Sequence, residues 1–577
     1  GQRFVVPGYF AADGAAGETS AESGNVWRAH FSPNRPGDWT YRVSFARGDG
    51  AALDTDTDAD ADAASEPVAG VDGLAGGFTV DPTDKSGRDF RGRGRLQYLG
   101  QRYLTFAETG DLFIKAGPDA PETLLAFEDF DGTTTRKTPL KSWAPHVQDW
   151  REGDPTWQGG KGRGLIGAIN YIASEGLNSM SFIPYNAGGD GDNVWPMIAP
   201  DKKLHYDCSK LDQWQVVFDH AQRNGVFLHF KLQETENDDH NIEAKGETGV
   251  VKAALDAGDL GPERKLYLRE LVARFGYAPA LNWNLGEENT QSTQQQRDMA
   301  RYLRSIDPYG HLVVLHTYPN QQDKNYKRHL GDKTTLTGLS LQNGWNDAHF
   351  RTRQWVRASA ESGHPWVVCN DEQNPASSGV PPNPGFKPAA GRKGAGDAKL
   401  NYTQDDIRKQ TLWGTLMAGG AGVEYYFGYK LPENDLVCED WRSRSGAWAD
   451  CRVAIGFFAG LGPSLGEMLP ADELVTVGGK AAFTAPKLPI RKKTKRAKPT
   501  AYCLAKPGES YLVYVLYGGV AELDLSDADG GFSIAWFNPR EGGEPIAGTV
   551  SSVDGGGRVA IGAPPTDDDW LAIVERE

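Results

Sequence analysis

The sequence predicts a central (β/α)8 barrel, or TIM barrel, flanked by an N-terminal and a C-terminal β-sandwich. The first observation is that short apolar runs alternate with helical patterns eight times between residues 93 and 462. Such a series specifies a parallel barrel more economically than an open sheet. The second is that both ends contain short aromatic and β-branched runs separated by turn residues, a pattern typical of sandwiches. An open doubly wound sheet is the less favoured alternative, because no GxGxxG or P-loop motif directly follows any predicted strand.

Residues 1–92 are predicted to form a small β-sandwich. Its strands are expected over residues 3–10, 26–31, 39–45 and 77–80. Alternating aspartates occupy residues 54–62. They could bind calcium, but no glycine is placed as in an EF-hand loop, so a solvated loop is favoured.

Residues 93–462 are predicted to form the barrel. Its strands are expected over residues 111–117, 178–185, 226–233, 280–285, 312–318, 336–342, 365–371 and 422–427. Helices are expected over residues 164–175, 211–224, 263–275, 292–306, 349–362, 403–417 and 447–461, with only a weak helical segment after the fifth strand. The strands are short and apolar enough to be buried on both faces, as barrel strands are.

Residues 463–577 are predicted to form the C-terminal antiparallel β-sandwich. Its strands are expected over residues 502–505, 510–517, 521–525, 532–538 and 570–574. The basic run at residues 491–500 could touch an anionic partner, but a solvated linker is favoured.

Composition excludes several classes of partner. The net charge of -16 argues against nucleic acid, and no apolar run approaches the roughly 20 residues of a membrane span. Five cysteines in 577 residues do not make a disulfide framework. Cys438 and Cys451 could form one bridge, but two free thiols are favoured.

The aromatic content favours a carbohydrate-active protein. The chain has 16 Trp and 21 Tyr, whose rings stack on sugars, although large cores use Trp as well. We therefore expect a secreted or periplasmic protein. The chain opens inside a predicted strand and shows no signal peptide, so the usual evidence for secretion is missing.

Polar and aromatic residues gather where the predicted strands end. In a parallel barrel these ends face the loops that build the active site, and carboxylates, amides and aromatic rings are what a sugar site requires. The candidates for substrate binding are Asn186, Trp195, Gln233, Glu234, Glu287, Asn289, His316, Tyr318, Gln342, Trp345, Asp371, Glu424 and Tyr426.

Two further acids are candidates for catalysis. Glu288 and Glu372 end the fourth and seventh strands, which face each other across a barrel mouth. Glycoside hydrolysis needs two carboxyl groups across one bond, about 5 Å apart in retaining enzymes and about 6.5–9.5 Å apart in inverting ones. Glu287 precedes Glu288, and because neighbouring residues of a strand point to opposite sides, we expect only one of them inside the site.

The motif from Trp283 to Glu288, WxxGxE, together with Glu372 resembles the pattern of the large retaining clan of (β/α)8 glycoside hydrolases. The three-part layout resembles bacterial apiosidase-like hydrolases with an N-terminal Ig-like sandwich and a C-terminal sandwich labelled collagen-binding. This closer likeness rests on the sequences PGYFAADG, FSPNRPGDWTYRV, YCLAKPGESYLVYV and FSIAWFNPREGG, and spans nearly the whole chain.

The resemblance implies a hydrolase acting on a plant, algal or bacterial polysaccharide, with Glu288 as acid/base and Glu372 as nucleophile. The chain departs from the clan in having Glu287 where an asparagine is usual, so either Glu287 or Glu288 could be the acid/base, and Glu288 is chosen by its alignment with the clan motif. No cofactor is expected, and no metal, since the sequence has no HExxH motif. Two alternatives remain open: a polysaccharide lyase that uses His316, Tyr425 or Tyr426, and a non-catalytic carbohydrate-binding protein.

Overall fold

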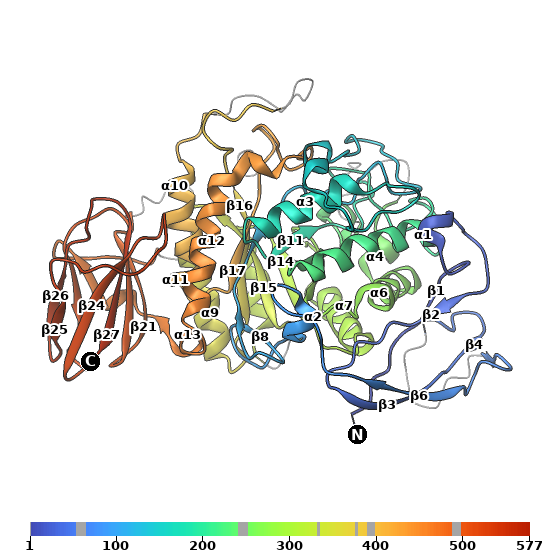
Figure 1. The fold of residues 1–577 in the computed structure, drawn as a ribbon, viewed down its shortest axis with the longest axis horizontal. Coiled ribbons are helices and arrows are strands. Elements are labelled where there is room, and N and C mark those ends of the chain that lie inside the picture. Colours follow the sequence, from blue (N-terminus) through green and yellow to red (C-terminus); the bar gives the residue numbers. More distant parts are fainter. Residues whose placement is uncertain are drawn as a thin grey trace.

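The computed structural model describes residues 2–53, 65–240, 252–331, 335–374, 379–388, 399–486 and 498–577. The alternating aspartates at 54–62 and residues 491–497 of the basic run lie outside the described residues. Figure 1 shows a central barrel with its ring of helices, the N-terminal segment on one side and the C-terminal sheets on the other.

The predicted barrel is confirmed as an eight-stranded parallel sheet with the strand order β10-β17-β16-β15-β14-β13-β12-β11. A backbone hydrogen bond of 3.0 Å from Asn178 N to Ala116 O joins the two ends of this order, so the barrel is nearly closed. The strands are β10 (Lys115–Pro118), β11 (Ser179–Phe182), β12 (Phe227–Lys231), β13 (Leu281–Asn284), β14 (Leu312–Thr317), β15 (Gly338–Gly344), β16 (Val367–Asn374) and β17 (Gly422–Tyr425).

Helices follow the strands as the sequence pattern predicts. They are α3 (Arg163–Ser174), α4 (Cys208–Arg223), α6 (Pro262–Phe275), α7 (Thr293–Ile306), α9 (Ala348–Glu361), α10 (Gln404–Asp406) continuing through η6 (Ile407–Leu412) into α11 (Trp413–Met417), and α12 (Ser445–Gly460). The first predicted strand is divided. Leu112–Phe113 form β9 in an antiparallel sheet with β7 (Leu96–Gln97) and β8 (Leu104–Phe106), and only β10 enters the barrel.

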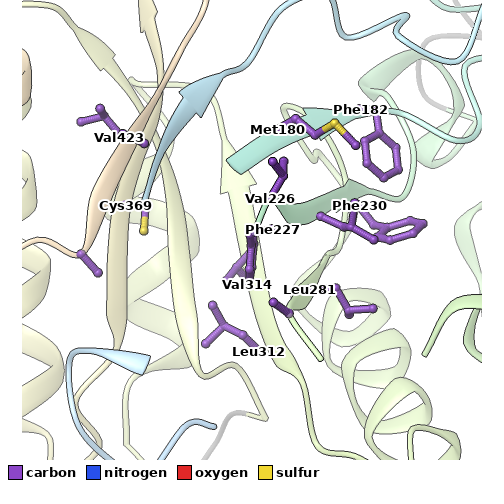
Figure 2. Packing of buried hydrophobic residues seen from close by; sticks show 14 of the residues in the cluster. Met180, Phe182, Val226, Phe227, Phe230, Leu281, Leu312, Val314, Cys369 and Val423 are labelled. Carbon is purple, nitrogen blue, oxygen red and sulfur yellow. The ribbon is translucent and has the colours of Figure 1, made fainter. Parts of the chain in front are cut away.

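Alternation along the barrel strands sends apolar side chains outward and polar ones inward. The rings of Phe182 and Phe230 pack on Phe218 of α4, with centroids 4.9 and 5.3 Å away. Figure 2 shows both rings turned toward the surrounding helices. The neighbouring Ser181 and Lys231 point into the barrel, where both contact Asp119. The barrel interior is therefore rich in buried polar groups.

The N-terminal part consists of small antiparallel sheets. The strands β1 (Tyr9–Phe10) and β2 (Trp27–Arg28) pair with each other, as do β3 (Gly37–Arg42) with β6 (Ala75–Val80) and β4 (Ala46–Arg47) with β5 (Glu66–Pro67). This part packs on the helical face of the barrel, where the Arg274 guanidinium of α6 lies 4.1 Å from the Tyr9 ring centroid.

The C-terminal part consists of two antiparallel sheets that share a core. One sheet has the order β18 (Leu469–Pro470), β21 (Ala501–Lys506), β22 (Ser510–Val515), β27 (Trp570–Arg576), β24 (Gly531–Phe537), β25 (Ser552–Asp554). The other has the order β20 (Lys480–Ala481), β19 (Val475–Val477), β23 (Ala521–Asp524), β26 (Arg558–Gly562).

All five cysteines are buried and unpaired, as favoured for Cys438 and Cys451. Within the described residues, no helix has the length and apolar character needed to cross a membrane.

Candidate active site

The chain after β13 carries two adjacent carboxylates into the barrel mouth. Gly286 has φ +145° and Glu288 has φ +45°, so the extended backbone, and with it the alternation of side chains, ends after Leu285. Gly286 also packs closely against Gln233: a side chain at position 286 would place its Cβ only 2.7 Å from Gln233 Cγ, so glycine is required there. Both Glu287 and Glu288 contact the residues around Glu372. The expectation that only one of them lies inside is therefore wrong.

Glu372 reaches the mouth from β16, which has an irregular register with β15. Leu341 pairs with Asn370 and Gln342 pairs with Glu372, so Asp371 is an extra residue in β16. A bulge of this kind redirects side chains. It sends Glu372 toward the mouth and Asp371 toward the layer beneath.

Gln342 connects the two acids predicted to be catalytic. Its Nε2 donates to Glu288 Oε1 at 2.5 Å and to Glu372 Oε1 at 2.6 Å. Because one nitrogen contacts both, these two oxygens lie no more than about 5 Å apart, which is shorter than the separation in inverting glycosidases and compatible with that in retaining ones.

Glu287 lies on the other side of Glu372. His316 Nε2 is 3.1 Å from Glu287 Oε1 and 3.3 Å from Glu372 Oε2. Ser340 Oγ lies 3.2 Å from the other ring nitrogen, Nδ1, which keeps Nε2 facing the two carboxyl groups. Carboxylate oxygens of Glu287 and Glu372 and the His316 ring nitrogen all lie within 4.8 Å of one another.

Lys231, at the end of β12, is the buried cation of this mouth. Its Nζ lies 2.7 Å from Asp119 Oδ1, 3.2 Å from Glu122 Oε1 and 2.5 Å from Glu287 Oε2. Of these residues, the sequence analysis singled out Glu287 and missed Lys231, Asp119 and Glu122. Two signals in the sequence could have found them: Lys231 lies inside an apolar strand, and Asp119 and Glu122 come just after the first barrel strand.

The carboxyl groups differ in charge because their neighbours differ. Burial opposes the ionisation of Glu287, but His316 and Lys231 favour it, and the pKa of Glu287 falls to about 2. Burial lowers the pKa of His316 to about 4, so at neutral pH this imidazole is neutral and Lys231 balances the Glu287 charge.

Glu288 is half-buried and behaves in the opposite way. Burial and the negative charge of Glu287 raise the pKa of Glu288 to about 7, although hydrogen bonds from Gln342 and Tyr318 oppose the shift. Burial, Glu287 and Glu288 raise the pKa of Glu372 well above its ordinary value. Near neutral pH the mouth therefore holds an ionised Glu287 and, close to it, two carboxyl groups that favour their protonated forms.

Two of the predicted substrate-binding residues lie in a layer beneath this mouth. Lys115 Nζ is 2.7 Å from Asp371 Oδ1 and 3.0 Å from Glu424 Oε2. Asp371 and Glu424 are fully buried and His229 contacts Glu424, so this ionic layer supports the mouth rather than facing a ligand.

Five other predicted residues are buried and support loops. Asn186 Oδ1 accepts from the backbone of Val194 at 2.7 Å, and Asn289 Nδ2 donates to Leu285 O at 3.1 Å. The others are Gln233, which donates to Leu285 O at 3.0 Å, Glu234, which accepts from Asp190 N at 3.1 Å, and Trp195, whose ring lies 5.7 Å from the Arg136 guanidinium.

Three aromatic residues remain candidates for contacts with a sugar. Tyr318 is half-buried and hydrogen-bonded to Glu288. Trp345 is half-buried and stacks on Tyr402 with ring centroids 5.0 Å apart. Tyr426 is buried beside Tyr429, with ring centroids 6.0 Å apart. Burial and nearby acids, Glu372 among them, raise the pKa of Tyr426.

Three groups of side chains among the described residues could hold a metal ion. They are His229, Asp371 and Glu424; Glu287, His316 and Glu372; and Asp119, Glu122 and Glu372, each with ligand atoms within 4.8 Å of one another. In each group a lysine, Lys115 or Lys231, already lies against at least one of the carboxylates. That ammonium supplies positive charge where a cation would bind.

Comparisons with known proteins support the fold. Residues 1–46 match a domain of unknown function, DUF5060. The comparison with curated proteins gives no match. A solved structure described as a glycoside hydrolase is 13% identical, with a TM-score of 0.56, and the match covers 84% of this chain and 97% of that one.

A glycoside hydrolase family 5 structure from Bacteroides vulgatus ATCC 8482 is 14% identical, also with a TM-score of 0.56, over 85% of this chain and 95% of that one. At this identity the likeness establishes the fold alone. The chain is thus a (β/α)8 barrel protein similar in fold to these two structures, with an N-terminal DUF5060 match and antiparallel sheets at both ends.

Proposed function

We propose that the protein is a glycoside hydrolase that cleaves its substrate with retention of configuration. The observation that carries this proposal is the single Gln342 nitrogen bonded to both Glu288 and Glu372, because it sets the two carboxyl groups at a separation compatible with retention. The substrate that we propose is a plant, algal or bacterial polysaccharide. The apiosidase-like assignment and a secreted or periplasmic location belong to the same proposal.

The two acids take different roles in this mechanism. Glu288, protonated up to about pH 7, donates its proton to the glycosidic oxygen as the bond to the leaving group breaks. Glu372 attacks the anomeric carbon and forms a glycosyl-enzyme. Glu288 then takes a proton from water, and that water releases the sugar with its original configuration.

A lyase mechanism fits the site less well. It needs a cation to neutralise a uronate and a base to take the proton at its C5. Lys231 is already shared by three carboxylates, and the pKa of Tyr426 is raised by burial and by nearby acids. Binding without catalysis would not require a carboxyl group held protonated beside Glu372.

The proposal is tested with a panel of polysaccharides, Glu288→Gln, Glu372→Gln and the control Glu361→Gln on the exposed end of α9. Both active-site variants are expected to lose on the order of 10³-fold or more in kcat on polysaccharide, and the control none. On aryl glycosides with good leaving groups, Glu288→Gln should recover much of its first step, whereas Glu372→Gln should not. NMR of the first product decides retention. A Glu372→Gln variant that stays near wild-type activity would refute the assignment.

A further inference from the structure

Glu372 has to be ionised to attack a sugar, yet its surroundings favour the protonated acid. It is 3% exposed, and two other carboxyl groups lie beside it. Its polar neighbours include Gln342, which donates to it, His316, whose Nε2 lies 3.3 Å away, and Glu287. A mechanism with Glu372 as nucleophile therefore needs a place for the proton of Glu372.

We propose that Glu287 is a positioning residue that shares one proton with Glu372 and receives it when Glu372 attacks. This inference rests on the proposed function. Its geometric basis is the single His316 nitrogen, which lies 3.1 Å from Glu287 and 3.3 Å from Glu372, together with the approach of all three side chains to within 4.8 Å of one another. Two buried carboxyl groups in such contact cannot both be ionised, so the pair retains one proton.

The surroundings of the pair are asymmetric. Lys231 Nζ lies 2.5 Å from Glu287 Oε2, so it favours the state with the charge on Glu287 and the proton on Glu372. The groups that face the pair are Lys231 of β12, His316 of β14, Asp119 and Glu122 after β10, Glu288 after β13 and Tyr426 after β17. Farther out, the charge of Glu287 raises the pKa of Glu234, just before α5 (Thr235–Asp238), and of Glu236, within α5.

The proton moves within the pair. The O–H bond of Glu372 breaks and an O–H bond forms on Glu287, so the negative charge passes to Glu372 and the charge of the pair is unchanged. Glu372 then attacks the anomeric carbon while Glu288 gives its own proton to the leaving oxygen. An asparagine at position 287 could donate a hydrogen bond but could not accept this proton.

The pH dependence of kcat/KM tests the proposal in Glu287→Gln. In the wild type the strongly acidic Glu287 ensures that the pair has lost one proton over the whole ordinary pH range. In the variant, Glu372 must ionise alone, so the acidic limb should move up by about one pH unit or more. The loss of the Glu287 charge should also lower the pKa of Glu288 and move the basic limb down.

A narrowing of the profile from both sides is therefore expected. Glu287→Asp, which retains a carboxylate, should restore part of the acidic limb, and Glu361→Gln should leave both limbs in place. A merely structural role would lower kcat without moving the limbs. Unmoved limbs in Glu287→Gln would overturn the proposal.

A second measurement needs no substrate. Infrared spectra at neutral pH in the Glu288→Gln background compare the band of protonated carboxyl groups with and without Glu287→Gln. Glu287, which the substitution removes, is ionised and contributes nothing to this band. One protonated carboxyl should nevertheless disappear, because Glu372 ionises once the negative charge of Glu287 is gone. An unchanged band would refute the shared proton. If the band changes but wild type cleaves nothing, the proposed function fails and the proton pair stands.

Discussion

At the scale of single residues, the chemical role of each acid follows from which neighbour it touches. Glu287 and Glu288 are adjacent in sequence, but Lys231 lies 2.5 Å from the first, whereas the second receives hydrogen bonds from neutral groups. A direct ammonium contact favours the ionised form, and burial beside a negative charge favours the protonated one. This contrast separates a general acid from its ionised neighbour.

Tyr318 offers a test of this contrast. Its hydroxyl bonds to Glu288 and favours the ionised form, so Tyr318→Phe should raise the pKa of Glu288 above its value of about 7. Because the general acid must be protonated, the basic limb of kcat/KM should move to higher pH, by up to about one unit. Tyr302→Phe on α7, whose hydroxyl donates to the backbone oxygen of Lys265 3.4 Å away, is the control. A basic limb that moves to lower pH in Tyr318→Phe would contradict this assignment.

At the scale of elements, the strands were predictable because eight apolar runs recur with helical patterns between them. Glu288 and Glu372 were predictable as candidates because strand ends face the mouth of a barrel. The local departures from regular strand geometry were not predictable. Neither the left-handed backbone at Glu288 nor the extra residue Asp371 has a signature in the alternation of side chains.

The ionic layers inside the barrel were missed for a related reason. A lysine in an apolar strand does not reveal which acids it will meet, because its partners come from strands distant in sequence. Lys115, for example, contacts Asp371 and Glu424 from β16 and β17. Such a layer can be located only when the register of the sheet is known.

Lys115→Met is expected to destabilise the barrel by about 3–5 kcal/mol, because it removes the ammonium that pairs with two buried carboxylates and leaves them with the weaker partners His229 and Ser179. The loss should be larger at pH 8 than at pH 5, since unpaired buried acids have raised pKa values and are neutral at the lower pH. Urea unfolding measures this loss in the free energy of unfolding. Lys202→Met, at an exposed pair 3.6 Å from Asp201, should cost less than about 1 kcal/mol. Equal losses in the two variants would contradict this role of Lys115.

At the scale of the whole molecule, β21 and β22 of the six-stranded C-terminal sheet are buried on both faces. Tyr502 and Leu504 of β21 and Tyr514 of β22 belong to the hydrophobic core of the barrel, whereas Cys503 and Val513 belong to the core between the two C-terminal sheets. The ring of Trp413, on α11, stacks on Tyr514 with centroids 5.0 Å apart. Because this contact is apolar and continuous with the barrel core, the C-terminal part should unfold together with the barrel.

Arg408→Ala tests this coupling. Arg408 lies in η6 and its Nη2 is 2.9 Å from Asp569 Oδ1, which is fully buried in the C-terminal part and also accepts from Tyr514 Oη at 2.7 Å. The substitution leaves a buried carboxylate with weaker partners, so we expect a loss of about 3 kcal/mol and a single, lower thermal transition. Arg452→Ala, which removes an exposed pair with Glu175, should cost less than about 1 kcal/mol. Calorimetry distinguishes the outcomes: two separate transitions in the Arg408 variant would show that the barrel and the C-terminal sheets do not fold as one cooperative unit.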